Sequence, residues 1–234
     1  MPNPTEDVKK QLLEAALPHV AFDGWSDKTF RMAVADSGID PAVADTVCPR
    51  GAIDLAVAFH EAGDAQMLKL LKKVDLSQMR FRDKVTTAVQ LRLDAISDKE
   101  AARRGATLFA LPQHGAIGAS LIWGTADAIW DALGDPSEDF NWYTKRATLS
   151  GVYAATVLYW LGDDSEGHAA TREFLDRRIE DVMRIEKVKG QVRANPVMKT
   201  LLAGPNWALS KVRAPAKMPR VDIPGVFSGQ SPDP

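Results

Sequence analysis

The chain has 234 residues, of which 45% are hydrophobic and 26% are charged, and its net charge at pH 7 is −2. This composition is typical of a soluble globular protein that can build a core of normal size without a disulfide or a metal. The single cysteine, Cys48, excludes a disulfide framework and a cysteine-based zinc site. The small net charge excludes a general attraction to nucleic acid.

The N-terminal residues show no targeting signal. They lack a charged segment followed by an apolar one, and they are too acidic for a transit peptide. The uncharged stretch 107–126 contains a proline, a histidine and three glycines, so we do not expect it to span a membrane. We therefore expect a cytoplasmic protein.

Residues 1–50 are expected to form three short helices. Thr5 and Ser26 are expected to cap the first two, and the third starts at Asp40-Pro41 and runs to about Val47, where Cys48-Pro49 stops it. A tight turn separates the second helix from the third, which is the outline of a helix-turn-helix module.

This module lacks the side chains that DNA binding requires. The recognition position, residues 40–47 (DPAVADTV), has two acids and no Arg, Lys, Asn or Gln, and residues 1–50 carry eight acids and five bases. Because DNA binding depends on phosphate neutralisation and on donors to base edges, we expect no sequence-specific DNA binding.

Residues 51–190 are expected to form a helical ligand-binding domain, so the fold class is all-α. Helices are expected over residues 52–71, 77–96, 99–111, 114–133, 139–161 and 167–188, with Ser77 as the cap of the second. In the helix 77–96, Phe81 is expected to face inward and Arg92 outward. Glycines 115, 118 and 124 each cost about 1 kcal/mol relative to alanine, so close packing or room for a ligand must compensate.

The segment that follows is basic and then rich in proline. Between Arg184 and Arg220 there are nine Lys or Arg residues and one acid, Glu186. Residues 191–214 are expected to be amphipathic and to contact an anionic membrane surface. The residues expected at this surface are Met198, Leu201, Leu202, Trp207 and Lys211. The alternative is a solvated tail or a helix packed on the body, and residues 215–234 are expected to be disordered.

Motifs for catalysis and for metal binding are absent from the sequence. The four histidines stand alone, no second histidine follows His60 after four residues, and no Glu-x-x-His pair occurs. There is also no phosphate-binding glycine loop and no GxSxG elbow. The chain is therefore predicted to be a binding protein with no metal and no catalytic residue.

The stretch 123–146, here called the acidic–aromatic corner, combines three tryptophans with five acids and has no base before Lys145. Asp127 and Asp131 are four residues apart and share a helix face. Large aromatic side chains beside uncompensated acids favour a surface that receives a partner. The alternative is an ordinary amphipathic corner whose tryptophans are core and whose acids face solvent.

Within this corner, residues 139–146 (DFNWYTKR) resemble a signature of the ninth Coq protein family, which are accessory proteins of ubiquinone (coenzyme Q) biosynthesis. The signature is DFNWYT, then Lys or Arg, then Arg. The resemblance extends over residues 6–190 and includes Asp23–Ser26, Leu111-Pro112 and Arg172–Ile179. The chain looks like an alphaproteobacterial-type relative of the mitochondrial protein.

The resemblance implies a TetR-like, all-α homodimer that has lost DNA binding and is not an enzyme. It implies a bound lipid or isoprenoid quinone in place of a cofactor, and peripheral association with the inner membrane. It also implies that the protein presents the membrane-embedded demethoxyubiquinone intermediate to a di-iron hydroxylase. A TetR-type ligand-responsive transcription regulator and a pure protein scaffold are the alternatives.

The resemblance also implies a partner-binding patch and a lipid pocket, and it assigns residues only to the patch. The hydroxylase-binding patch of the family matches Asp127, Ile129, Trp130, Trp142, Tyr143 and Arg146. For the lipid pocket, we expect side chains of the central helices: Phe109, Leu111, Leu121, Trp123, Tyr153, Val157 and Trp160. Within the corner, we expect Asp127, Asp131, Trp130 and Tyr143 to be partly exposed and Trp123 to face the apolar interior.

Overall fold

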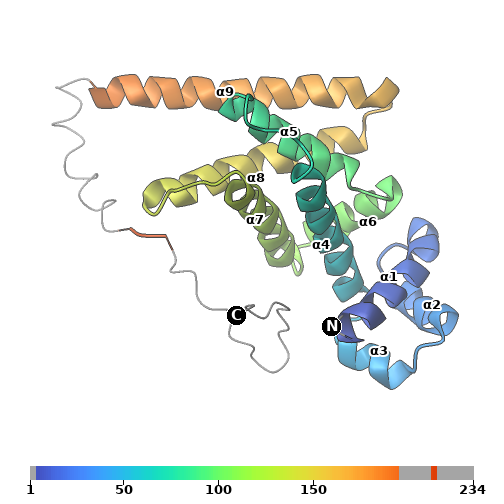
Figure 1. The fold of residues 1–234 in the computed structure, drawn as a ribbon. Helices are drawn as coiled ribbons and strands as arrows, with labels where there is room; N and C mark the ends of the chain where they lie inside the picture. Colours follow the sequence, from blue (N-terminus) through green and yellow to red (C-terminus); the bar gives the residue numbers. More distant parts are fainter. Residues whose placement is uncertain (1–3, 195–211, 215–234) are drawn as a thin grey trace.

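The computed structural model describes residues 4–194 and 212–214, with the side chains of residues 185–194 left aside. Every regular element in these ranges is helical, which confirms the all-α prediction (Figure 1). The elements are α1 (Pro4–Asp23), α2 (Asp27–Ser37), α3 (Pro41–Val47), α4 (Ala52–Leu71), α5 (Phe81–Asp94), α6 (Lys99–Ala110), α7 (Gly115–Ala132), α8 (Phe140–Leu161), a short 3-10 turn (Glu166–His168) and α9 (Ala169–Ala194). Within the described residues, no helix is both long and apolar enough to cross a membrane.

Helices α1, α2 and α3 form the predicted helix-turn-helix module at one end of α4 (Figure 1). Two predicted caps are confirmed, because Ser26 Oγ accepts from the Thr29 amide at 3.3 Å and Asp40 Oδ1 accepts from the Ala42 amide at 2.8 Å. These short polar side chains satisfy amides that a helix N-terminus leaves without a backbone partner.

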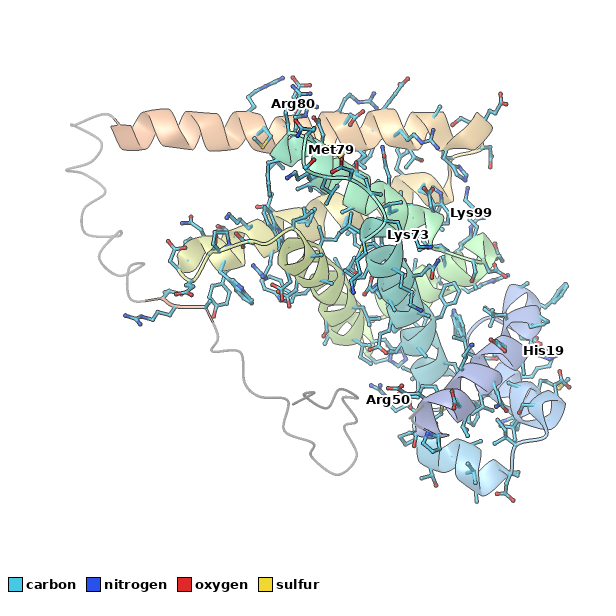
Figure 2. All side chains as sticks on the ribbon, viewed as in Figure 1. His19, Arg50, Lys73, Met79, Arg80 and Lys99 are labelled. Atoms are coloured by element: carbon cyan, nitrogen blue, oxygen red, sulfur yellow. The ribbon has the colours of Figure 1, made fainter. Side chains whose placement is uncertain are left out.

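Helix α4 joins the module to the rest of the molecule. Leu55 and Ala56, near its N-terminus, belong to the core of the module, whereas Met67 and Leu71 belong to a second core with α5, α7, α8 and α9. Arg50, just before α4, lies beside the module in Figure 2 and forms an ion pair with Asp54. The two cores therefore share one continuous helix.

Three expectations about helix α5 are wrong. It begins at Phe81 after a turn, so Ser77 is not its cap. The Phe81 ring is exposed and stacks on Trp130, whereas Arg92 is only 2% exposed. Arg92 lies seven residues after Val85 and four after Ala88, so the helical period places it on the buried face with them.

The glycines of α7 differ in the space around them. A Cβ atom on Gly118 would lie 2.8 Å from Phe109 Cβ of α6, whereas a Cβ on Gly124 would meet nothing within 4 Å. Close helix packing therefore accounts for Gly118 but not for Gly124.

This difference predicts opposite effects of two alanine substitutions in one helix. Gly124→Ala should raise the free energy of unfolding by up to about 1 kcal/mol, because alanine is the better helix former. Gly118→Ala should lower it by about 1 kcal/mol or more, because overpacking outweighs the same propensity gain. Urea unfolding followed by circular dichroism measures both, and a shift of both midpoints in one direction would contradict the packing argument.

Candidate functional site

A cavity of about 840 Å³ lies among α1, α4, α6, α7, α8 and the C-terminal end of α5. Most of its wall is apolar, and its aromatic and larger aliphatic side chains include Leu13, Leu17, Phe59, Phe109, Leu121, Ile122 and Val157. The cavity opens to solvent at its edge, where lining residues such as Lys10 and Lys69 are exposed. The volume falls within the range of pockets that hold small-molecule ligands, about 300–1,000 Å³.

Four of the seven predicted lipid-binding residues line this cavity: Phe109, Leu121, Tyr153 and Val157. The other three residues, Leu111, Trp123 and Trp160, do not line it. Leu111 is exposed just after the last turn of α6. Trp123 lies on another face of α7, where its ring contacts the ring of Trp142. Trp160 packs with Leu93 and Leu161, because it lies seven residues beyond Tyr153, or about 10 Å further along α8.

One part of the cavity wall is polar and joined by hydrogen bonds. His60 Nε2 lies 2.9 Å from Thr125 Oγ1, and the Thr125 hydroxyl donates to Asp64 Oδ1 at 2.9 Å. Arg92 Nε donates to the same carboxylate oxygen at 2.5 Å, and Arg92 Nη2 donates to the His60 carbonyl at 2.9 Å. We call these four residues the polar wall. His60 and Arg92 face the cavity, whereas Thr125 and Asp64 stand behind them.

Gly63 makes room for this arrangement. A Cβ atom at Gly63 would lie 2.5 Å from Arg92 Nη1 and 2.7 Å from Arg92 Cζ. Because the guanidinium is held by Asp64 and by the His60 carbonyl, it cannot move aside without breaking those bonds.

The sequence analysis did not identify the polar wall as a site. Two signals were available: His60 and Asp64 are four residues apart on one helix, and Arg92 falls in an apolar stripe. Neither signal shows that α4, α5 and α7 meet, and Thr125 gives no signal of its own.

Burial shifts the pKa values of two side chains that line the cavity, His60 and Tyr153. Burial, followed by the positive charge of Arg92, lowers the pKa of His60 from 6.5 to about 4. Burial also raises the pKa of the Tyr153 hydroxyl to about 12. At neutral pH both groups are uncharged, and Arg92 and Asp64 compensate each other.

The lowered pKa of His60 predicts a pH-dependent stability. Because the folded-state pKa of about 4 lies below the ordinary value of 6.5, the unfolded chain binds more protons between these values. Stability should therefore rise with pH across that window and be lost as pH falls through it, by about 3 kcal/mol at pH 4. Urea unfolding from pH 4 to 7 tests this, and His60→Gln should have a smaller slope than the wild type. Equal slopes would show that His60 does not cause the dependence.

The acidic–aromatic corner is organised around Arg146. This side chain is 1% exposed, and its guanidinium bonds to Asp127, to Asp131 at 3.0 Å and to Asp135 at 3.2 Å. It also lies over the ring of Trp142, 4.0 Å from the centroid. The acids are therefore compensated by a base, contrary to the sequence-based interpretation.

The structure divides the predicted partner-binding residues into two groups. Ile129, Trp130 and Arg146 are buried, so placing them at a partner surface is wrong, as is the expected exposure of Trp130. Trp142 and Tyr143 are half-buried, and the side chains of Asp127 and Asp131 are 40% and 45% exposed. The expected partial exposure of Asp127, Asp131 and Tyr143 is confirmed.

The aromatic part of the corner is continuous. The Trp142 ring lies 4.8 Å from the Tyr143 ring and 5.9 Å from the Trp123 ring, measured between centroids. Trp123 is half-buried and belongs to this group, so its expected position facing the apolar interior is wrong.

A distant part of the chain contacts the corner. The Ala214 amide donates to the Glu138 carbonyl at 2.8 Å, and the Tyr143 hydroxyl donates to the Arg213 carbonyl at 3.3 Å. Figure 1 shows residues 212–214 as a short coloured piece near the start of α8. The five residues expected to contact a membrane, at 198–211, lie outside the described residues.

Known proteins are similar to this chain over the helices that form the acidic–aromatic corner. The COQ9 family model matches residues 116–186, which include most of α7, all of α8 and the first part of α9. The ubiquinone biosynthesis protein COQ9 of Drosophila melanogaster, a mitochondrial protein, is 31% identical over 189 residues, which are 79% of this chain and 58% of that protein. The COQ9 protein of Rattus norvegicus is 31% identical over 200 residues, which are 81% of this chain and 63% of that protein.

The fold has a solved counterpart. A TetR transcriptional regulator from Nitrosomonas europaea superposes with a TM-score of 0.59 at 18% identity, over 74% of this chain and 97% of that one, which shows a TetR-like fold. The chain spans about three-fifths of the length of the curated relatives described above. The matched region holds the acidic–aromatic corner and the α7 and α8 walls of the cavity, and on this evidence the chain belongs to the COQ9 family.

Proposed function

We propose that this protein is a non-enzymatic accessory protein of ubiquinone biosynthesis that binds a lipid or an isoprenoid quinone. The single observation that carries the proposal is the largely apolar cavity of about 840 Å³. Each square ångström of apolar surface that a tail buries there contributes about 25 cal/mol. The names of the relatives, ubiquinone biosynthesis proteins, support the pathway. The bound lipid takes the place of a cofactor.

The partner in this proposal is the di-iron hydroxylase that acts on demethoxyubiquinone. Its docking surface is the exposed part of the acidic–aromatic corner, Asp127, Asp131, Trp142 and Tyr143. Aromatic side chains in contact with one another are typical centres of protein interfaces. The buried Arg146 holds Trp142 and the carboxylates in place, so it supports this surface from behind.

Two experiments test the proposal. Mass spectrometry of the purified protein should detect isoprenoid or quinone species, and their absence, together with failure to bind a quinone analogue, would overturn the proposed lipid binding.

Pull-down of the hydroxylase should be lost with Tyr143→Ala and kept with Tyr159→Ala, a change at an exposed tyrosine near the other end of α8. Equal capture by both variants would place the docking surface elsewhere.

The proposal includes peripheral membrane association and a homodimer. Deleting residues 191–234 should abolish co-sedimentation with anionic liposomes, because the deletion removes six of the nine Lys and Arg residues of 184–220. Unchanged co-sedimentation would show that this segment does not contact the membrane.

Light scattering measures the oligomeric state, and a monomeric mass at micromolar concentration would contradict the homodimer.

A TetR-type regulator is the second candidate, because the fold favours it. Helix α3 (Pro41–Val47) carries no basic residue and exposes Asp45, which would face DNA phosphates. A salt-sensitive gel shift with the upstream DNA would favour the regulator over the accessory protein.

A further inference from the structure

Two groups at the start of α8 bind opposite sides of one peptide group from the far end of the chain. That peptide group joins Arg213 to Ala214. Its oxygen accepts from the Tyr143 hydroxyl at 3.3 Å, and its N–H donates to the Glu138 carbonyl at 2.8 Å. Because the peptide bond is trans, its C=O and N–H point in opposite directions, so the group lies between its two partners. We call the Glu138 carbonyl and the Tyr143 hydroxyl the peptide clamp.

The peptide clamp contacts main-chain atoms of the bound segment. Every residue except proline offers both an N–H and a C=O, so these two contacts do not depend on the side chains of the segment. Residues 212–214 form no regular secondary structure, and Pro215 disfavours a helical conformation in Ala214 before it. The clamp therefore fits a non-helical stretch of backbone with few demands on its sequence.

The peptide clamp lies within the proposed docking surface. Tyr143 is one of the four residues of that surface, and its ring contacts the ring of Trp142, 4.8 Å away between centroids. Glu138 is exposed and directly precedes Asp139, the N-cap of α8. The start of α8 thus offers aromatic faces and a backbone-binding clamp in one place, beside residues 212–214 in Figure 1.

The bound segment restricts access to this surface. The Tyr143 hydroxyl has one hydrogen, and it donates that hydrogen to the Arg213 carbonyl, so a partner can use this donor only after the segment leaves. Two hydrogen bonds contribute modestly to stability, so the segment can be displaced. Because the segment belongs to the same chain, its effective concentration is high. The apparent affinity of a partner falls with the fraction of molecules whose clamp is free.

We propose that the peptide clamp binds a non-helical backbone segment of the partner protein, and that residues 212–214 occupy it as an internal competitor. This inference rests on the proposed docking surface and adds a regulation of that surface. The partner binds tightly only after residues 212–214 have left the clamp.

Two substitutions at Ala214 test the competition in the full-length protein. Ala214→Pro removes the N–H that donates to Glu138, whereas Ala214→Gly keeps it. Titration calorimetry with the di-iron hydroxylase should show that Ala214→Pro binds about threefold or more tightly than the wild type, and that Ala214→Gly stays within about twofold of it. Equal affinities of the two variants, or weaker binding by Ala214→Pro, would overturn the competition.

Amide exchange in the free protein tests the clamp without the partner. Nuclear magnetic resonance of protein with isotope-labelled alanine measures the exchange rate of the Ala214 amide. Tyr143→Phe removes the hydroxyl and keeps the ring, so this amide should exchange about threefold or more faster than in the wild type. Tyr159→Phe, a change at an exposed tyrosine near the other end of α8, should leave the rate unchanged.

The two measurements distinguish the clamp from the proposed function. An unchanged exchange rate in Tyr143→Phe would overturn the clamp and leave the docking surface and the lipid binding intact. If Tyr143→Phe speeds the exchange but no Ala214 variant and no wild-type protein binds the hydroxylase, the proposed partner is wrong, and so is the competition with it.

Discussion

Replacing Arg146 with methionine is expected to lower the free energy of unfolding by about 3 kcal/mol or more. The guanidinium is 1% exposed and bonds to three carboxylates of the α7 end and the following loop. Asp135, whose side chain is also 1% exposed, would keep only Lys145 as its ion-pair partner. The loss of stability should stay near the lower end of the range for broken buried ion pairs, about 3–5 kcal/mol. The reason is that the partly exposed carboxylates of Asp127 and Asp131 can be hydrated when the guanidinium is removed.

Urea unfolding of this variant requires two controls. Arg146→Lys keeps the charge but lacks the planar fork that reaches several carboxylates, so it should recover only part of the loss. Arg178→Met breaks an exposed pair with Asp181 and should cost less than about 1 kcal/mol. A loss below about 1 kcal/mol for Arg146→Met would show that the corner does not depend on Arg146.

Replacing Arg92 with methionine should lower the free energy of unfolding by about 3–5 kcal/mol. Arg92 is 2% exposed, and its removal leaves the carboxylate of Asp64, which is only 18% exposed, without its cation. The His60 carbonyl also loses its side-chain donor.

A double-mutant cycle separates the unpaired charge from the lost packing. Asp64→Asn in the Arg92→Met background removes that charge and should recover about 1 kcal/mol or more. The control is Arg80→Met, a change at an exposed arginine at the start of α5. It should lower the free energy of unfolding by less than about 1 kcal/mol. If Arg92→Met and Arg80→Met cost the same, Arg92 is not a buried ionic centre.

Helix positions and most helix ends in this protein follow from local sequence. Ser26, Asp40, Asp98 and Asp139 each accept from an amide two or three residues later, so a short stretch of chain contains the whole interaction. The start of α5 was predicted wrongly because its N-cap, Arg80, provides no such bond. The DFNWYTKR signature identified the family because it is a contiguous string of side chains.

The positions of the two buried arginines depended on contacts between helices. Arg92 meets Asp64 across 28 residues of sequence, and Arg146 meets Asp127 across 19. On a helix considered alone, an arginine is expected to face water, because exposure costs nothing and burial requires a partner. The partners are visible only when α4 lies beside α5 and α7 beside α8.

The sequence alone therefore determined the all-α class, the helix-turn-helix outline, the caps Ser26 and Asp40, and the family. Only the tertiary structure decided that Phe109, Leu121, Tyr153 and Val157 share one cavity while Leu111, Trp123 and Trp160 do not. The physical reason is that periodicity gives the face of each helix but not the neighbour or the depth at which that face packs.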